Sequence, residues 1–89
     1  MVKRNKLMEK LGFLAPVVEK VHGANHPELH EVNQLAQSLQ EKYEDGKFDE
    51  ATQIFQFLQR VTDYYTLPED ACEGYTELYT TLKLLDESR

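Results

Sequence analysis

The sequence predicts an all-α protein, an antiparallel up-down-up-down four-helix bundle that forms a single domain over residues 1–89. Four stretches place apolar residues three or four positions apart, which is the spacing of one face of a helix. Short stretches with Gly, Pro, Asn or Asp separate them, and no stretch alternates as a strand would. Helices of similar length, about 27 Å at 1.5 Å per residue, pack side by side when short turns join them.

The first helix is predicted over residues 4–22. Pro16 lies inside it and has no backbone N–H, so a kink or a delayed start of the helix is expected. One stripe of apolar residues should face the core: Leu7, Leu11, Leu14, Val18 and Val21.

The second helix is predicted over residues 26–44. Asn25 and Glu28 fit a capping box, in which the Asn25 side chain accepts a hydrogen bond from the backbone N–H of Glu28 and the Glu28 carboxylate reaches back. The helix should end at the turn pair Asp45-Gly46 and bury one stripe: Leu29, Val32, Ala36, Leu39 and Tyr43.

The third and fourth helices are predicted over residues 47–65 and 67–86. Thr66 and Glu69 repeat the spacing of a capping box, which places the start of the fourth helix there. The third helix carries an apolar face made of Ala51, Ile54, Phe55, Leu58, Val61 and Tyr65. The fourth carries Ala71, Tyr75, Leu78, Leu82 and Leu85, with Cys72 and Tyr79 beside them.

Composition and charge argue against several classes of protein. With 40% hydrophobic and 29% charged residues, the chain is expected to fold rather than remain disordered. The formal net charge of −6 predicts no nucleic-acid binding, because the basic residues at the start of the chain are too few to attract a phosphate backbone: Lys3, Arg4, Lys6 and Lys10. No apolar run reaches the ~20 residues of a membrane span and no leader is recognised, so a cytoplasmic protein without membrane contact is expected.

The candidate metal ligands are three histidines within nine residues, His22, His26 and His30. Neutral imidazole binds iron and zinc, and side chains four positions apart on a helix can share one ion. The simpler interpretation is structural, with His26 in a turn, His30 in solvent and His22 packed at a helix end, because no further histidine or cysteine completes a metal shell.

No catalytic residues are predicted. The many acids in the first turns of the last two helices are explained by their favourable interaction with helix N-termini. Cys72 is the single cysteine of the chain, which suits a reducing compartment, and no histidine lies near it in the sequence. We expect Cys72 to be a buried structural residue beside the apolar stripe of the last helix, and the protein not to be an enzyme.

Two segments together resemble a known family. Residues 20–29 read KVHGANHPEL, and residues 61–75 read VTDYYTLPEDACEGY. The pair is similar to the KVHG-x-x-HPEL-like and T-x-x-Y-x-x-P-x-x-A-C-x-x-Y-like runs of the hemerythrin-like di-iron proteins that repair iron–sulfur clusters after nitrosative or oxidative damage. The resemblance covers roughly residues 14–85 and implies a four-helix bundle with two irons between its helices.

The resemblance also implies histidine and glutamate ligands that this chain mostly lacks. A His-x-x-x-Glu pair expected near the end of the second helix has no counterpart in residues 41–46, and a histidine expected early in the third helix falls near Phe48. The last His-x-x-x-Glu pair would follow Arg89. His22 is the one residue carried over as a remnant of the iron site.

We therefore expect a non-enzymatic accessory or interaction domain, similar to the iron–sulfur cluster repair proteins, that acts in nitrosative and oxidative stress. It would need no cofactor and would work with a protein partner or as a homodimer. One alternative is a metal-binding protein, in which a carboxylate or a second subunit completes a partial site for iron or zinc formed by the three histidines. Another is a helical-repeat scaffold for protein binding, because residues 45–51 followed by Phe55 resemble a tetratricopeptide turn.

Overall fold

The computed structural model describes residues 4–88, which contain four helices and no strand. The helices are α1 (Arg4–His22), α2 (Glu28–Glu44), α3 (Phe48–Val61) and α4 (Glu73–Glu87). The prediction of an all-α protein with four helices is confirmed. Residues 1–3 and 89 of the predicted domain lie outside the described residues. Within the described part of the chain, no helix combines the length and the apolar character needed to cross a membrane.

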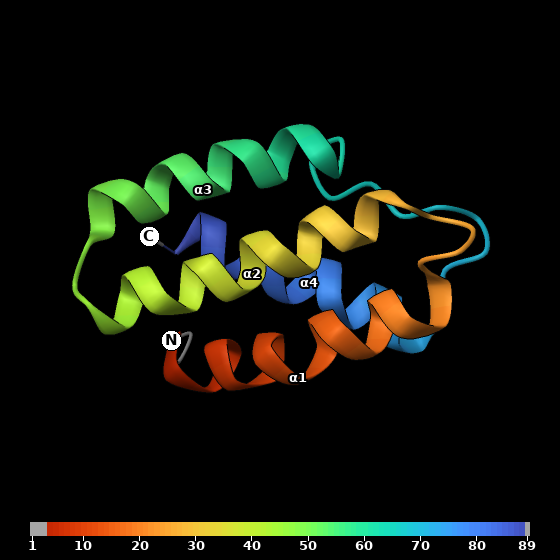
Figure 1. Ribbon diagram of the computed structural model, residues 1–89, viewed down its shortest axis with the longest axis horizontal. Helices are drawn as coiled ribbons and strands as arrows, with labels where there is room; N and C mark the ends of the chain where they lie inside the picture. The colour runs from red at the N-terminus through yellow and green to blue at the C-terminus, as the bar shows by residue number, and fades with distance from the viewer. Residues whose placement is uncertain (1–3, 89) are drawn as a thin grey trace.

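Helix α1 packs against two others, α2 and α4, and α2 packs against α3 on its other side. Figure 1 shows α3, α2 and α1 one below the other, with α4 behind α1 and α2. The start of α1 and the end of α4 lie at the same end of the molecule (Figure 1). The whole measures 34 × 23 × 20 Å. Because α4 packs on α1, the chain must cross the opposite end of the molecule after α3, and residues 62–72 do so; we call them the crossing loop.

All four helices contribute to one apolar core, as their 3–4 periodicity predicts. Burying a large apolar side chain contributes roughly 1.5–3 kcal/mol each. Val21 was predicted in this core and is not there: it is 67% exposed and lies on the same side of α1 as the exposed Val17. The core consists of Leu11, Leu14, Ala15, Val18, Leu29, Val32, Ala36, Leu39, Ala51, Ile54, Phe55, Leu58, Tyr75, Leu78, Tyr79, Leu82 and Leu85.

Helix α1 begins at Arg4 despite Pro16, so the expected delayed start is wrong. Pro16 is exposed while its neighbour Ala15 is buried, so packing on the opposite face compensates for the missing hydrogen bond. Helix α2 approaches α1 closely at Gly12, where an added Cβ would meet Nε2 of Gln40. That nitrogen donates to the carbonyl of Met8 at 2.7 Å and links the two helices.

Two predicted helix starts are wrong. Helix α2 begins at Glu28 rather than at residue 26, with Pro27 as the N-cap and no side-chain cap hydrogen bond, so the expected Asn25 capping box does not form. Helix α4 begins at Glu73 rather than at residue 67, and Cys72 is its N-cap. The reason is the crossing loop, whose residues 66–72 are used to span the end of the molecule instead of extending the helix.

Smaller differences occur at three other helix ends. Helix α3 begins at Phe48 rather than at residue 47 and ends at Val61 rather than at residue 65, and α4 ends at Glu87 rather than at residue 86. The early end of α3 follows from three consecutive residues with left-handed backbone, Asp63, Tyr64 and Tyr65, at φ values of 51°, 55° and 64°. Non-glycine residues rarely adopt this conformation, so their neighbours must stabilise it.

Hydrogen bonds hold this left-handed turn in place. The Thr62 hydroxyl accepts from the backbone N–H of Tyr65 at 2.9 Å and donates to the carbonyl of Leu58. The Tyr65 hydroxyl donates to Oδ2 of Asp86 at 2.9 Å, and Nε2 of Gln59 donates to the same oxygen at 2.6 Å. Asp86 is buried on α4, so these bonds connect the end of α3 to α4.

We predict that Tyr65→Phe lowers the free energy of unfolding by about 1–2 kcal/mol, because it removes one hydrogen bond to a buried carboxylate and leaves the ring in place. Urea unfolding followed by circular dichroism measures the change. The matched control is Tyr64→Phe, since Tyr64 has the same left-handed backbone but is 73% exposed, and it should leave stability unchanged. Equal effects of the two substitutions would rule out a contribution from the bond to Asp86.

Candidate functional site

The two segments that carry the family resemblance meet in space. Figure 1 shows the turn between α1 and α2 beside the crossing loop, at the end of the molecule opposite to the start of α1. Side-chain contacts join them across 44 and 50 positions of sequence, through His26 with Asp70 and His22 with Cys72. The buried Tyr75 lies next to both histidines. We call these five residues the end cluster.

His26 is held between two carboxylates. Its Nε2 lies 2.9 Å and 3.0 Å from the two oxygens of Asp70, and its Nδ1 lies 3.3 Å from a carboxylate oxygen of Glu28. The hydrogen bond to Asp70 raises the pKa of His26 above its ordinary value, and the same bond lowers the pKa of Asp70. The turn position expected for His26 is confirmed, and its carboxylate partners explain what holds the crossing loop against α2.

Cys72 differs from its prediction as a buried structural residue. It is exposed, and its Sγ lies 3.0 Å from Nε2 of His22, a distance at which the thiol can donate a hydrogen bond to the imidazole. His22 ends α1 and Cys72 precedes α4, so this contact also connects the two helices that pack against each other. A cysteine beside a histidine is the arrangement in which imidazole takes the thiol proton.

Tyr75 positions the two imidazoles. Its ring lies 5.3 Å from that of His22 and 5.6 Å from that of His26, both in edge-to-face geometry. Tyr79 contacts Tyr75 from the next turn of α4 at 5.0 Å. Burial raises the pKa values of both phenols, so they are protonated at neutral pH and do not act as bases.

His30 lies apart from the end cluster. It is exposed, as the structural interpretation predicts, and its Nδ1 is 3.2 Å from a carboxylate oxygen of Glu19 on α1. The structure therefore brings His22 and His26 to one tyrosine ring and places His30 with a different partner. Among residues 4–88, no three His, Cys, Asp or Glu side chains gather closely enough to hold a metal ion.

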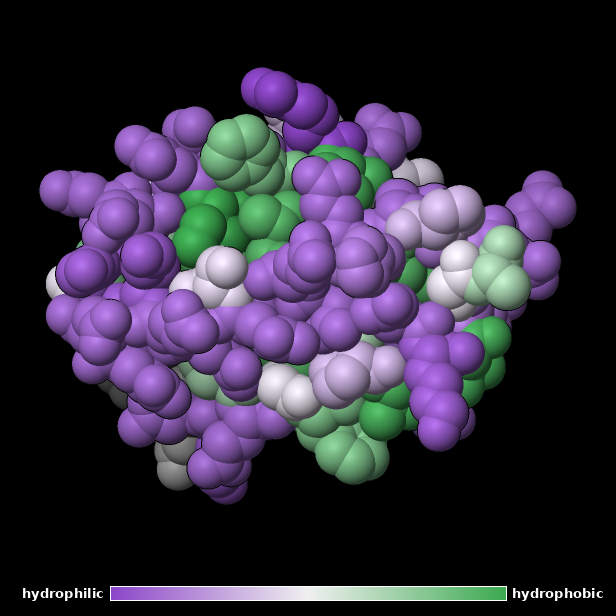
Figure 2. Space-filling model, viewed as in Figure 1, coloured by the Kyte–Doolittle hydropathy of each residue, from purple (hydrophilic) through white to green (hydrophobic). Residues whose placement is uncertain are grey.

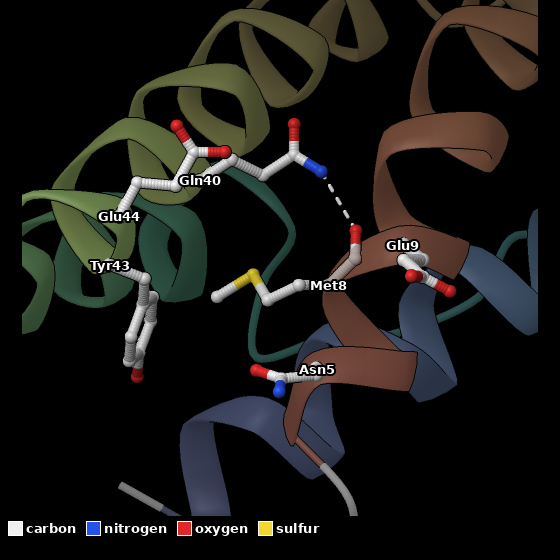
Figure 3. A pocket seen from close by; sticks show the side chains of 6 residues that line it. All are labelled: Asn5, Met8, Glu9, Gln40, Tyr43 and Glu44. Atoms are coloured by element: carbon white, nitrogen blue, oxygen red, sulfur yellow. Dashed lines mark hydrogen bonds between the residues drawn. The ribbon is translucent and has the colours of Figure 1, made fainter.

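Two hollows lie at opposite ends of the molecule. A shallow groove of about 390 Å³ runs beside it and is lined in part by Glu28, Leu67 and Tyr75. A second hollow of about 280 Å³ lies at the opposite end, between the start of α1 and the end of α2 (Figure 3). Its polar lining includes Glu9 and Glu44 but no nucleophile paired with a base. The end cluster is therefore the candidate functional site.

Sequence reasoning identified His22 and His26 but missed their partners. Cys72 and Asp70 were assigned to a helix start, because Thr66 and Glu69 match a capping pattern. In the structure, the crossing loop lies against the turn after α1, which brings Cys72 to His22 and Asp70 to His26. The one signal in the sequence was that the two segments of the resemblance each carry these residues.

We predict a pH-dependent contribution of His26 to stability. A raised pKa in the folded state stabilises the fold below the unfolded pKa of about 6.5, and this stabilisation is lost as the pH rises through the folded value. The lowered pKa of Asp70 stabilises the fold above the unfolded pKa of about 4, and this stabilisation is lost as the pH falls through the folded value. The difference in unfolding free energy between wild type and His26→Ala should therefore be largest near pH 5 and smaller at pH 9.

Urea unfolding at these two pH values measures the difference, and NMR titration of His26 checks its cause. Asp70→Asn is the matched control and should return the pKa of His26 toward its ordinary value, because it removes the carboxylate charge. If the difference in unfolding free energy between wild type and His26→Ala is the same at pH 5 and pH 9, the charges of His26 and Asp70 do not contribute to stability.

Comparison with known proteins gave no match: no protein-family model, no curated protein and no solved structure corresponds to this chain. The relation to the hemerythrin-like repair proteins thus stays a resemblance of residues 20–29 and 61–75. What this site can do must be inferred from its own geometry.

Proposed function

We propose that the protein is a cytoplasmic, non-enzymatic interaction domain that assists a hemerythrin-like iron–sulfur cluster repair protein during nitrosative or oxidative stress. The observation that carries the proposal is an exposed apolar stripe on α1. Phe13, Val17 and Val21 are 69%, 44% and 67% exposed and follow one another at intervals of four residues. Residues at this spacing share one side of a helix, and a contiguous apolar surface of this kind marks a protein interaction site.

Other features support an interaction surface on this side of the molecule. Figure 2 shows a face that is mostly hydrophilic, with hydrophobic atoms gathered along the lower edge over α1 and near the upper edge over α3. We call Phe13, Val17 and Val21 the α1 stripe. These residues are exposed, and α1 contributes to the core through a neighbouring row of buried residues: Leu11, Leu14, Ala15 and Val18. An apolar surface without a structural role in the monomer is available to a partner.

The proposal extends to the fold family. We infer an antiparallel, hemerythrin-like bundle, supported by the meeting of residues 20–29 and 61–75 in the end cluster and by the packing of α1 between α2 and α4. The helical-repeat alternative has less support, because the chain is compact, with a radius of gyration of 12.0 Å, and its helices share one core.

We predict that the protein binds a purified hemerythrin-like di-iron repair protein and increases the rate at which that protein restores activity to an iron–sulfur dehydratase damaged by nitric oxide. Phe13→Ser should weaken binding at least about tenfold, since losing one buried aromatic side chain costs roughly 1.5–3 kcal/mol. Calorimetric titration measures the affinity, and recovery of dehydratase activity measures the effect on repair.

The matched control is Phe57→Ser, which removes an aromatic ring that is 50% exposed on α3 instead of on α1. It should leave both affinity and recovery unchanged. Absence of binding by the wild-type chain, together with an unchanged rate of recovery, would reject the proposed function. Equal losses in the two variants would place the interaction elsewhere than the α1 stripe.

The second candidate function is metal binding by His22, His26 and His30, with a carboxylate or a second subunit completing the site. It is favoured by the contact of two of these histidines with the same ring and by the carboxylates of Asp70 and Glu28 beside His26. Such a site would take iron or zinc, which suit imidazole and carboxylate ligands.

Metal analysis separates the two candidates. From the proposed accessory function, we predict no stoichiometric iron or zinc after anaerobic reconstitution and desalting. Stoichiometric metal that is lost in His26→Ala but retained in His30→Ala would instead assign the site to the end cluster. Metal lost in both variants would require His30 to move away from Glu19 and join the other two histidines.

A further inference from the structure

Lysines and apolar residues share one row on the outer side of α1. The members of this row are separated alternately by four and by three residues, and all of them are exposed. Residues at this spacing face one direction along a helix, because seven residues make almost two turns. We call this set the outer row: Lys6, Lys10, Phe13, Val17 and Lys20.

The centre of the outer row is apolar and both of its ends are positive. Phe13 and Val17, which are 69% and 44% exposed, occupy the centre. Lys6 and Lys10 precede them and Lys20 follows, so the row is about 21 Å long at 1.5 Å per residue. Because the chain as a whole has a net charge of −6, the outer row is a positive strip on a negatively charged molecule.

Neighbouring side chains leave most of this positive charge unpaired. Among residues 4–88, neither Lys6 nor Lys20 forms an ion pair, and Nζ of Lys10 lies 3.8 Å from a carboxylate oxygen of Glu77 on α4. Glu19, which precedes Lys20 in the sequence, accepts a hydrogen bond from Asn33 on α2 at 2.8 Å. The lysines at the two ends of the row are therefore available to carboxylates of another molecule.

We propose that the outer row packs against an amphipathic helix of the partner, one whose apolar residues are flanked at both ends by glutamate or aspartate. This inference rests on the proposed function for the identity of the partner and adds the chemistry of its surface. Alternating spacings of four and three residues are those by which two helices pack side by side. The partner's apolar residues cover Phe13 and Val17, and its carboxylates pair with the lysines at the ends.

A second copy of this chain is a poorer occupant of the outer row. If two outer rows packed in parallel, each lysine would face its own counterpart, and if they packed antiparallel, Lys20 would face Lys6. Like charges placed opposite each other repel, whereas carboxylates at the same positions attract. Charge therefore favours a different protein over self-association through this face.

A flat anionic surface, such as a membrane, is a poorer occupant for a different reason. Glu77 lies beside Lys10, and Glu73 lies one turn earlier on α4; both glutamates are exposed. A flat surface wide enough to cover α1 would meet these carboxylates, and an anionic surface is repelled by them. One helix lying along α1 covers a narrower strip, so the outer row favours a helix.

Calorimetric titration with a purified hemerythrin-like di-iron repair protein tests the role of the charges. Lys6→Glu and Lys20→Glu should each weaken binding about fivefold or more at low salt, because each substitution places a carboxylate opposite a carboxylate. The loss should shrink in about 0.5 M salt, which screens exposed charges. The matched control is Lys47→Glu, which makes the same change of charge just before α3, a helix that packs on α2, and it should leave the affinity unchanged.

Two synthetic helical peptides separate this inference from the proposed function. Both carry the same row of leucines at their centre, and one has glutamates at the flanking positions where the other has lysines. The full chain should bind the acidic peptide at least about tenfold more tightly than the basic one, and the double variant Lys6→Glu/Lys20→Glu should lose that preference. Fluorescence anisotropy of labelled peptides measures the affinities, and circular dichroism checks that each variant is folded.

The outcomes distinguish the two claims. Preference for the acidic peptide without binding to the repair protein would reject the proposed function and retain the outer row as a site for an acidic helix. Binding to the repair protein that Phe13→Ser weakens, but that Lys6→Glu and Lys20→Glu leave unchanged, would overturn the inference and retain the proposed function. Equal affinity for the two peptides would also overturn it, and so would a dimer of this chain that Phe13→Ser dissociates in sedimentation.

Discussion

The contacts of His22 and His26 with the crossing loop fix the path by which the chain passes from α3 to α4. Ordering backbone costs roughly 1–2 kcal/mol per residue, and the crossing loop contains no helix or strand to offset that cost. Side-chain hydrogen bonds at both of its ends offset part of that cost: His26 donates to Asp70 in the end cluster, and Tyr65 donates to Asp86 beside the core. These contacts act together with the core packing of α4 on α1, which sets the position of the helix that the loop leads into.

The helices were predictable from the sequence, whereas several of their ends were not. Periodicity reports which residues face a core, and the buried residues of α2 match the predicted stripe from Leu29 to Leu39. Capping patterns are short, and their residues can serve other partners. Glu28, expected to reach back to a cap, instead lies beside Nδ1 of His26. Thr66, expected to cap a helix, donates to the carbonyl of Asp63 within the turn.

The candidate site was only half predictable for a related reason. Local spacing singled out His22, His26 and His30, but the partners of the first two lie 44 and 50 positions further along. Such pairings depend on the position of α4, which is set by the packing of whole helices. The left-handed backbone of three successive residues after α3 could not be predicted from the sequence either, because none of Asp63, Tyr64 and Tyr65 is a glycine.

The packing of α1 on α4 also determines the order in which the protein can complete its core. During synthesis, α1, α2 and α3 emerge first, and α2 can pack on α1 and then α3 on α2, while the side of α1 that carries Val18 stays uncovered. An added Cβ at Gly74 would lie 3.9 Å from Val18, which shows how closely the start of α4 approaches that side. The nascent chain therefore exposes apolar surface until α4 has left the ribosome, and over that interval it is open to chaperones and to aggregation.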